Sequence, residues 1–292
     1  RDLHSFPTRR SSDLNRCVYD SMLNACPYKG KNSVVARLIE VERGRAAVFL
    51  TLYARLFSFF PGIGAVCDFL DAVECSTHCA VKDLAARSRT EIQRSVEAII
   101  GNDEQTLNDS ARVLMEIEVL LREWRLDLDR MDSWAAEKPS TIHRTYGFGK
   151  VLNRVKQAEG VPENYVMPEW HEYEIHSARL HPTPEVVESL LPGPVLRVSE
   201  LVSHVSRVIA SMVSVLEVDD PRLPQNFLGS LAVDMAPWSQ LRDDIIGYRD
   251  SWIKERLAKR GLMMAPRMPI PKGVSWSEGR VVPLESDAPA GK

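Results

Sequence analysis

A run of apolar residues at helical spacing lies near the middle of the chain and limits the folds that it can adopt. In NDSARVLMEIEVLLREWRLDLDRMDSW the apolar positions follow at steps of one, three, three, one and three residues, and they are Val113, Leu114, Ile117, Leu120, Leu121 and Trp124. This spacing places them on one face of an α-helix, as in helices that face a core. Asp109 is suited to cap the first turn. The segment predicts a long core helix from Asp109 to about Glu137, closed by Pro139.

The same helical period recurs along the chain, whereas no segment shows the alternation typical of strands joined by a turn. We therefore predict an all-α fold, a multi-helix bundle of about seven to nine helices with an extended C-terminal tail. The further helices are expected over residues 33–60, 65–100, 150–159, 168–181, 184–191, 197–217 and 237–260. Pro61 and Gly62 should turn the chain, Ser76-Thr77 is the place for a break, and Gly101 should take the left-handed backbone conformation that ends a helix.

The two ends of the chain differ from the helical part. Residues 1–14, RDLHSFPTRRSSDL, back-translate without mismatch into the end of a common short-read sequencing adapter, so we interpret them as non-native. The natural polypeptide is then expected to begin at Asn15, with its own N-terminus and any targeting signal missing. From Leu262 onward, five prolines and no periodicity predict an extended tail. We expect a single helical domain over residues 15–261 and a Pro-rich tail over residues 262–292.

Composition narrows the class of protein. A hydrophobic fraction of 44% with 26% charged residues is that of an ordinary globular chain, and a net charge of −3 argues against a broad nucleic-acid surface. The cysteine count of five is odd, which favours reduced thiols in a cytoplasmic protein. The apolar run from Ala46 to Cys67 contains Arg55 and is broken by Pro61. We therefore expect a buried helix there rather than a membrane span.

Two groups of residues have side chains that bind metals. His171, His176 and His181 recur every five residues, so they cannot share one helical face, but Glu172 and His176 lie one turn apart. Glu172, His176 and His181 are the candidate ligands of this group, and solvated histidines are the alternative. The second group is Cys67, Cys75, His78 and Cys79. It lacks the Cys-x-x-Cys turn of structural zinc sites, so buried thiols also explain it.

A third candidate site is the segment RVSELVSH, which places Arg197 and His204 seven residues apart on one helical face. This Arg-x6-His segment resembles the catalytic motif of the HEPN-domain ribonucleases, in which the arginine and the histidine act on the RNA backbone. That resemblance implies a metal-independent ribonuclease with Arg197 and His204 as catalytic residues. Val198 stands where the family has a polar residue.

A broader resemblance covers residues 85–216. The helix SARVLMEIEVLLREW, followed by EWHEYEIHSARLHPTP, is similar to bacterial all-helical proteins of a domain of unknown function, in which an Arg-x-x-x-Glu helix precedes a Ser-x-x-x-His segment. The matching positions are Arg112, Glu116, Ser177 and His181. The resemblance implies a helical fold and a polar cluster at these residues, and it supplies no activity. If Arg112 and Glu116 face inward, His176 or His181 would join them.

The function predicted from these observations is that of a non-enzymatic bacterial protein acting through helix-mediated self-association or a protein partner. No cofactor, nucleic acid or membrane is part of this prediction. Two alternatives stay open: the ribonuclease of Arg197 and His204, and a metal-binding helical protein built on Glu172, His176 and His181.

Overall fold

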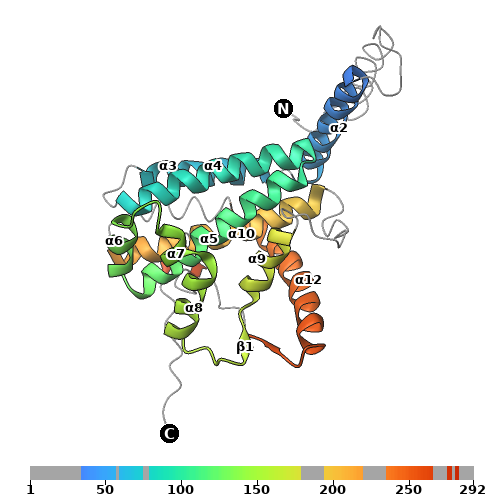
Figure 1. Ribbon diagram of the computed structural model, residues 1–292. Helices are drawn as coiled ribbons and strands as arrows, with labels where there is room; N and C mark the ends of the chain where they lie inside the picture. Colours follow the sequence, from blue (N-terminus) through green and yellow to red (C-terminus); the bar gives the residue numbers. More distant parts are fainter. Residues whose placement is uncertain are drawn as a thin grey trace.

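A computed structural model describes residues 34–56, 59–74, 79–178, 194–219, 235–265, 275–277 and 280–282. It confirms the all-α fold class (Figure 1). The helices of the first half are α2 (Val34–Arg55), α3 (Phe59–Glu74), α4 (Cys79–Gly101), α5 (Glu104–Leu126), α6 (Asp129–Ala135) and α7 (Ile142–Tyr146). Those of the second half are α8 (Phe148–Ala158), α9 (Pro168–Ala178), α10 (Pro194–Asp219), the short 3₁₀ turn η1 (Ala236–Trp238) and α12 (Ser239–Ala258). The helix expected over residues 184–191 lies outside the described residues.

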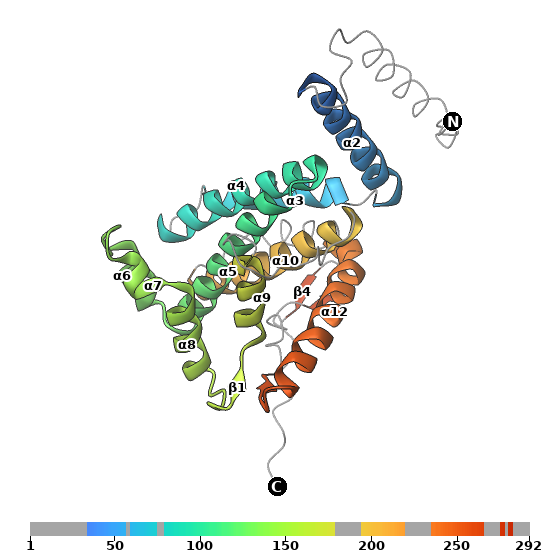
Figure 2. The same cartoon turned by 45° about the vertical axis from the view of Figure 1, so that its right-hand side comes forward.

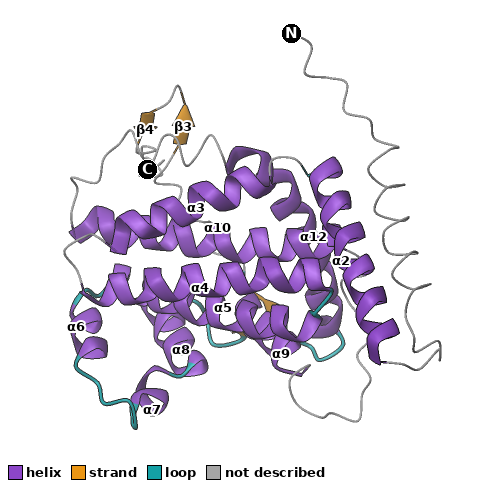
Figure 3. Ribbon diagram, turned by 90° about the horizontal axis from the view of Figure 1, so that it is seen from above, coloured by secondary structure: helices purple, strands orange, loops and turns teal. Residues whose placement is uncertain are grey.

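Helix α10 lies at the centre of the fold, where it packs against α5, α4 and α12 (Figure 3). Every residue from Arg197 to Ile209 is buried, so α10 is covered on all sides rather than along one stripe. The predicted stripe of α5 is buried against this centre, with Leu114, Leu121 and Trp124 fully inaccessible. The core is therefore built around α5 and α10, the two helices that also contribute most of the buried polar residues.

The turn predicted at Pro61 and Gly62 is wrong by a few residues. The chain leaves α2 after Arg55 and enters α3 at Phe59, so both residues lie in the first turns of α3. Proline is tolerated there because the first amide groups of a helix have no partner in the helix. Gly62 is required for packing, since a Cβ atom at this position would come within 2.4 Å of the Trp238 ring.

The start of the central helix also differs from the prediction. Helix α5 begins at Glu104, and its cap is Asp103, whose carboxylate accepts a 3.1 Å hydrogen bond from the Thr106 amide. Asp109, the predicted cap, lies inside the helix. The left-handed residue that ends α4 is Asn102, with φ of 56°, and not Gly101. Helix α5 ends at Leu126, before a separate short helix α6, rather than continuing to Glu137.

In the second half of the chain, the helix boundaries agree more closely with the predicted ones. Pro168 begins α9, and Gly160 and Gly261 have positive φ after α8 and α12, as expected of glycines that end helices. The beginning of the predicted tail is part of the fold, because β2 (Met263–Met264) pairs in parallel with β1 (Tyr165–Val166) and Ala265 is buried beside it. Farther along, β3 (Ser275–Ser277) and β4 (Arg280–Val282) form an antiparallel pair.

Among the described residues, one helix is long and apolar enough to cross a membrane, the segment Pro194–Leu216, which is the central helix of the fold and 94% buried. The segments Arg37–Ala54 and Phe59–Val73 pass the same test only as a pair, and they meet at a bend of 89°. The apolar run from Ala46 to Cys67 is therefore divided between two helices instead of forming a single buried one.

Candidate functional site

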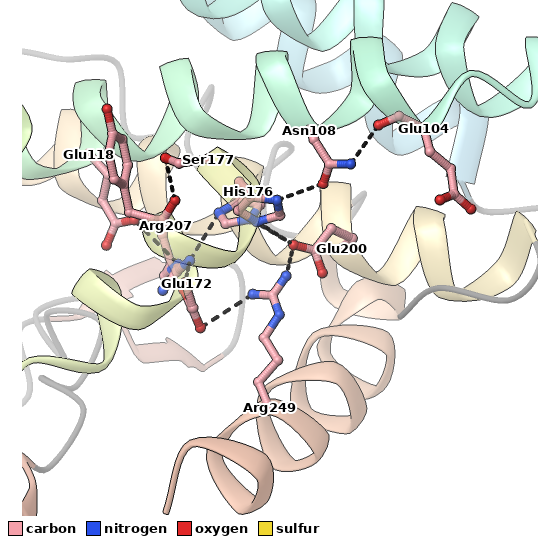
Figure 4. Close-up of polar contacts among 11 residues, drawn as sticks. Glu104, Asn108, Glu118, Glu172, His176, Ser177, Glu200, Arg207 and Arg249 are labelled. Carbon is pink, nitrogen blue, oxygen red and sulfur yellow. Dashed lines mark hydrogen bonds and ion pairs between the residues drawn. The ribbon is translucent and has the colours of Figure 1, made fainter. Parts of the chain in front are cut away.

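Four helices bring their polar residues together in the interior (Figure 4). We call this group the buried polar network. It consists of Asn108 and Glu118 on α5, Glu172 and His176 on α9, Glu200, His204 and Arg207 on α10, and Arg249 on α12. Each of these residues is less than 9% exposed. Burying charged groups is costly unless they are paired, so the contacts within the network decide what it can do.

Two pairs of residues with the same spacing contribute the acids and the imidazoles. Glu172 and His176 lie one turn apart on α9, and Glu200 and His204 lie one turn apart on α10. A separation of four residues places both members of a pair on one face of their helix. The pairs meet because both faces turn inward, and the two imidazole rings lie 5.4 Å apart in an edge-to-face arrangement.

His176 is held in one orientation. Its Nδ1 lies 2.8 Å from Oδ1 of Asn108, and Nδ2 of Asn108 donates a 2.7 Å hydrogen bond to the carbonyl of Glu104. The carbonyl only accepts, which fixes the orientation of the amide, so Oδ1 must accept a proton from Nδ1 of His176. Nε2 then faces Oε1 of Glu200 at 3.0 Å. Because both atoms carry lone pairs, a positive ion must lie between them: a proton or a metal ion.

His204 contacts the same carboxylate oxygen. Its Nε2 lies 3.0 Å from Oε1 of Glu200, and its Nδ1 lies 3.0 Å from Nη2 of Arg207. A guanidinium only donates, so Nδ1 of His204 is the acceptor and Nε2 carries the proton. The ligand atoms of His176, Glu200 and His204 all lie within 4.8 Å of one another. Glu200 is therefore the centre of a three-residue group with metal-ligand chemistry.

Two arginines balance the buried carboxylates. Arg207 donates a 2.9 Å hydrogen bond to Glu172, and its Nε lies 3.3 Å from Glu118. Arg249 forms ion pairs with Glu172, at 3.3 Å, and with Oε1 of Glu200. Burial alone would lower the pKa of Arg207, but the carboxylates of Glu118 and Glu172 raise it above its usual value. Burial raises the pKa of Glu118 in spite of the neighbouring Arg207.

The candidate ligands predicted from sequence have different roles. His176 belongs to the three-residue group around Glu200, whereas Glu172 binds the two arginines. His181, as well as Cys75 and His78, lies outside the described residues. Glu200 was not among the predicted ligands, although its spacing to His204 repeats that of Glu172 to His176 and would have revealed it.

The residues of the family resemblance meet at a tyrosine. Arg112 donates a 2.9 Å hydrogen bond to the hydroxyl of Tyr173, which donates a 2.8 Å hydrogen bond to Glu116. Arg112 and Glu116 are half-buried and are joined by Tyr173 and not by His176. Ser177 donates to the backbone carbonyl of Tyr173. These residues form a cluster beside the buried polar network.

The two residues of the ribonuclease motif bind different partners. Arg197 donates a 2.6 Å hydrogen bond to Glu104 and contacts Asn102, whereas His204 contacts Glu200 and Arg207. Their exposures are 6% and 1%. An RNA backbone would have to reach both side chains, so the ribonuclease prediction requires α10 to become accessible.

The fold and the site define a class: an all-α protein with a closed, buried carboxylate–imidazole–guanidinium centre. Comparison with protein-family models, with curated proteins and with solved structures found no match.

Proposed function

We propose that the protein binds one divalent transition-metal ion through His176, Glu200 and His204. The observation that carries this proposal is the spacing of the ligand atoms, 3.0 Å from Oε1 of Glu200 to Nε2 of either histidine. Metal–ligand bonds of about 2.0–2.2 Å place neighbouring ligand atoms roughly 3.0–3.4 Å apart, so the spacing is that of a first coordination shell.

The chemistry of the residues supports the same proposal. Imidazole and carboxylate together suit zinc or iron. Metal-binding histidines usually donate their second N–H to an oxygen, and Asn108 accepts that proton from His176. Oε2 of Glu200 is buried and has no hydrogen-bond partner among the described residues, so it is available as a further ligand atom.

Binding requires three local changes. The ion must replace the proton between Nε2 of His176 and Oε1 of Glu200, which is released to solvent. The single ring proton of His204 must leave Nε2 for Nδ1, which breaks the hydrogen bond from Arg207. Arg207 keeps Glu172 and Glu118 as partners. The ion must also replace Arg249 at Oε1 of Glu200, while Arg249 keeps Glu172.

The closed surroundings favour a structural ion over a catalytic one. His176, Glu200 and His204 are 4%, 1% and 1% exposed, and α5, α9, α10 and α12 surround them. Catalytic metal sites keep one coordination position open to substrate, whereas structural sites are closed. A bound ion would therefore link α9 to α10 and stabilise the bundle.

The experiment is a metal titration of the whole chain after treatment with a chelator. We expect one Zn²⁺ or Co²⁺ per chain by isothermal calorimetry, visible absorption from bound Co²⁺, and a higher melting temperature. His176→Ala should abolish all three effects. His171→Ala is the matched control, because His171 lies on the same helix and is equally buried at 5% exposure. Equal binding by His176→Ala and wild type would refute the site. No binding by wild type would refute the proposal as well, and the positive ion between His176 and Glu200 would then be a proton.

A further inference from the structure

Helix α2 carries apolar side chains that the other described residues cover only in part. Its C-terminal half is anchored, since Leu52 is fully buried and the helix packs mainly on α4. Its N-terminal half extends away from the body at one end of the molecule (Figures 1 and 2). Leu38, Phe49 and Tyr53 are 58%, 43% and 52% exposed. Monomeric proteins rarely leave a contiguous set of large apolar side chains in water.

These residues form one continuous stripe along the helix. Leu38, Glu42, Arg45, Phe49 and Tyr53 follow at steps of four, three, four and four residues. Such steps keep all five on one face, and we call this face the α2 stripe. Val41 lies beside it and is 46% exposed. Only the two central positions of the stripe are charged, and Arg45 pairs with Glu42 of its own helix at 3.0 Å.

We propose that the α2 stripe is the interface of a homodimer, in which two copies of α2 pack antiparallel about a two-fold axis between residues 43 and 44. In this register Leu38 faces Phe49 of the second copy, and Glu42 faces Arg45 of the second copy. The symmetry repeats both contacts, as a two-fold interface requires. The proposal is independent of the metal site, because no residue of the stripe belongs to the buried polar network.

Charge complementarity favours an antiparallel orientation and a second copy of the chain as the partner of the α2 stripe. In a parallel pair each residue faces its own copy, so Glu42 would face Glu42 and Arg45 would face Arg45, which is unfavourable. The antiparallel register changes both into attractive pairs and covers the apolar ends. The stripe is thus complementary to itself, which is a property expected of a surface that binds a second copy. A lipid surface would give no reason for an opposite-charge pair at the centre.

The first test is analytical ultracentrifugation of the full chain and its variants over a wide concentration range. We expect a reversible monomer–dimer equilibrium for wild type and a monomer for Phe49→Asp. Leu126→Asp is the matched control, because Leu126 is 47% exposed at the far end of α5. It should dimerise as wild type does. Equal weakening by both changes would overturn the proposal.

A charge exchange tests the register and guards against variants that do not fold. Glu42→Arg and Arg45→Glu, each alone, place like charges opposite one another and should weaken the dimer by about tenfold or more. The double variant restores opposite charges and should recover wild-type dissociation. Failure of the double variant to recover while it remains folded by circular dichroism would refute this register.

A membrane is the competing occupant, since the pair Arg37–Ala54 and Phe59–Val73 passes the test for apolar length. Flotation with phosphatidylcholine vesicles separates the two cases. A wild-type chain that is monomeric at every concentration and floats with the vesicles would overturn the dimer. A chain that stays monomeric and does not float with the vesicles would also overturn the dimer proposal.

Discussion

At the level of single residues, the neighbours of His176 and His204 determine which nitrogen of each imidazole ring carries a proton. Asn108 forces a proton onto Nδ1 of His176, and Arg207 forces the acceptor role onto Nδ1 of His204. These two neighbours determine that Nε2 of His176 points a lone pair at Glu200 and that Nε2 of His204 points a proton at it. The carboxylate therefore faces one ring that needs a positive ion and one that supplies a proton. The difference between the histidines comes from their neighbours, because their burial is nearly the same.

Arg249 is the residue whose removal should separate stability from metal binding. Arg249→Met leaves Glu172 and Glu200 without this guanidinium, so we expect the metal-free protein to lose about 3–5 kcal/mol of unfolding free energy. A metal ion replaces part of the lost charge, so added Zn²⁺ should stabilise the variant more than wild type. Urea unfolding with and without Zn²⁺ measures both effects.

The control for this change lies on the same helix. Arg242 is more exposed than Arg249 and pairs with the exposed Asp243, so Arg242→Met should cost less than about 1 kcal/mol. If Arg249→Met costs no more than Arg242→Met, the ion pairs of Arg249 do not stabilise the fold.

At the scale of elements, the beginning of α5 shows how a buried polar residue can conceal a helix start. The first turns of α5 bury Asn108 and Ser110 together with Leu107. The apolar period becomes visible only from Val113, so the sequence predicts the nearest acid before it, Asp109, as the cap. The five additional residues of the helix, 104–108, place Asn108 where it contacts His176. The start of α5 is thus set by the site as well as by the core.

Replacing the two aspartates one at a time tests the cap. The hydrogen bond from the Thr106 amide lowers the pKa of Asp103 below its ordinary value of 3.8. Its contribution is therefore complete above that pH and is lost as the pH falls through the lower, folded-state value. Asp103→Ala should cost about 0.5–2 kcal/mol near neutral pH, and Asp103→Asn should cost less. Thermal unfolding over a range of pH measures the loss.

Asp109→Ala is the control, because it removes the same charge from the same helix without removing a cap. We expect a change within about 0.5 kcal/mol. A larger loss for Asp109→Ala than for Asp103→Ala would contradict the assignment of the helix start.

At the level of the whole molecule, the segment after α12 pairs with the segment that precedes α9. Met263 and Met264 pair with Tyr165 and Val166, and the amide of Ala265 donates a 2.8 Å hydrogen bond to Val166. Ala265 is fully buried. This pairing holds α12, which carries Arg249, against the segment that leads into α9, which carries Glu172 and His176. The site therefore depends on a contact that lies at the edge of the predicted tail.

Truncation measures the value of this contact. A chain that ends at Gly261 loses β2 and the buried Ala265, so we expect a loss of about 1–3 kcal/mol of unfolding free energy. A chain that ends at Ala265 retains the pairing and should unfold within about 0.5 kcal/mol of the full chain. Equal stabilities of the two truncated chains, measured in urea, would show that the pairing contributes nothing.

Much of the fold could be predicted because its signals are local. The apolar spacing of α5, the proline that begins α9, and the glycines after α8 and α12 each act within a few residues of the place they determine. The errors arose where a contact from a distant segment intervened. Pro61 and Gly62 are typical of a turn, but they lie in α3, where the ring of Trp238 packs against Gly62. Met263 and Met264 read as tail until their partners in β1 are known.

The helical class of the protein and the placement of Glu172 and His176 on a common helical face could thus be predicted from the sequence. The contact of His176 with Glu200, and those of Arg249 with Glu172 and Glu200, follow from the tertiary packing. The physical reason is that helical spacing fixes which residues share a face, whereas the rotation of one helix against another is set by the packing of the whole core. Which acid meets which imidazole depends on that rotation.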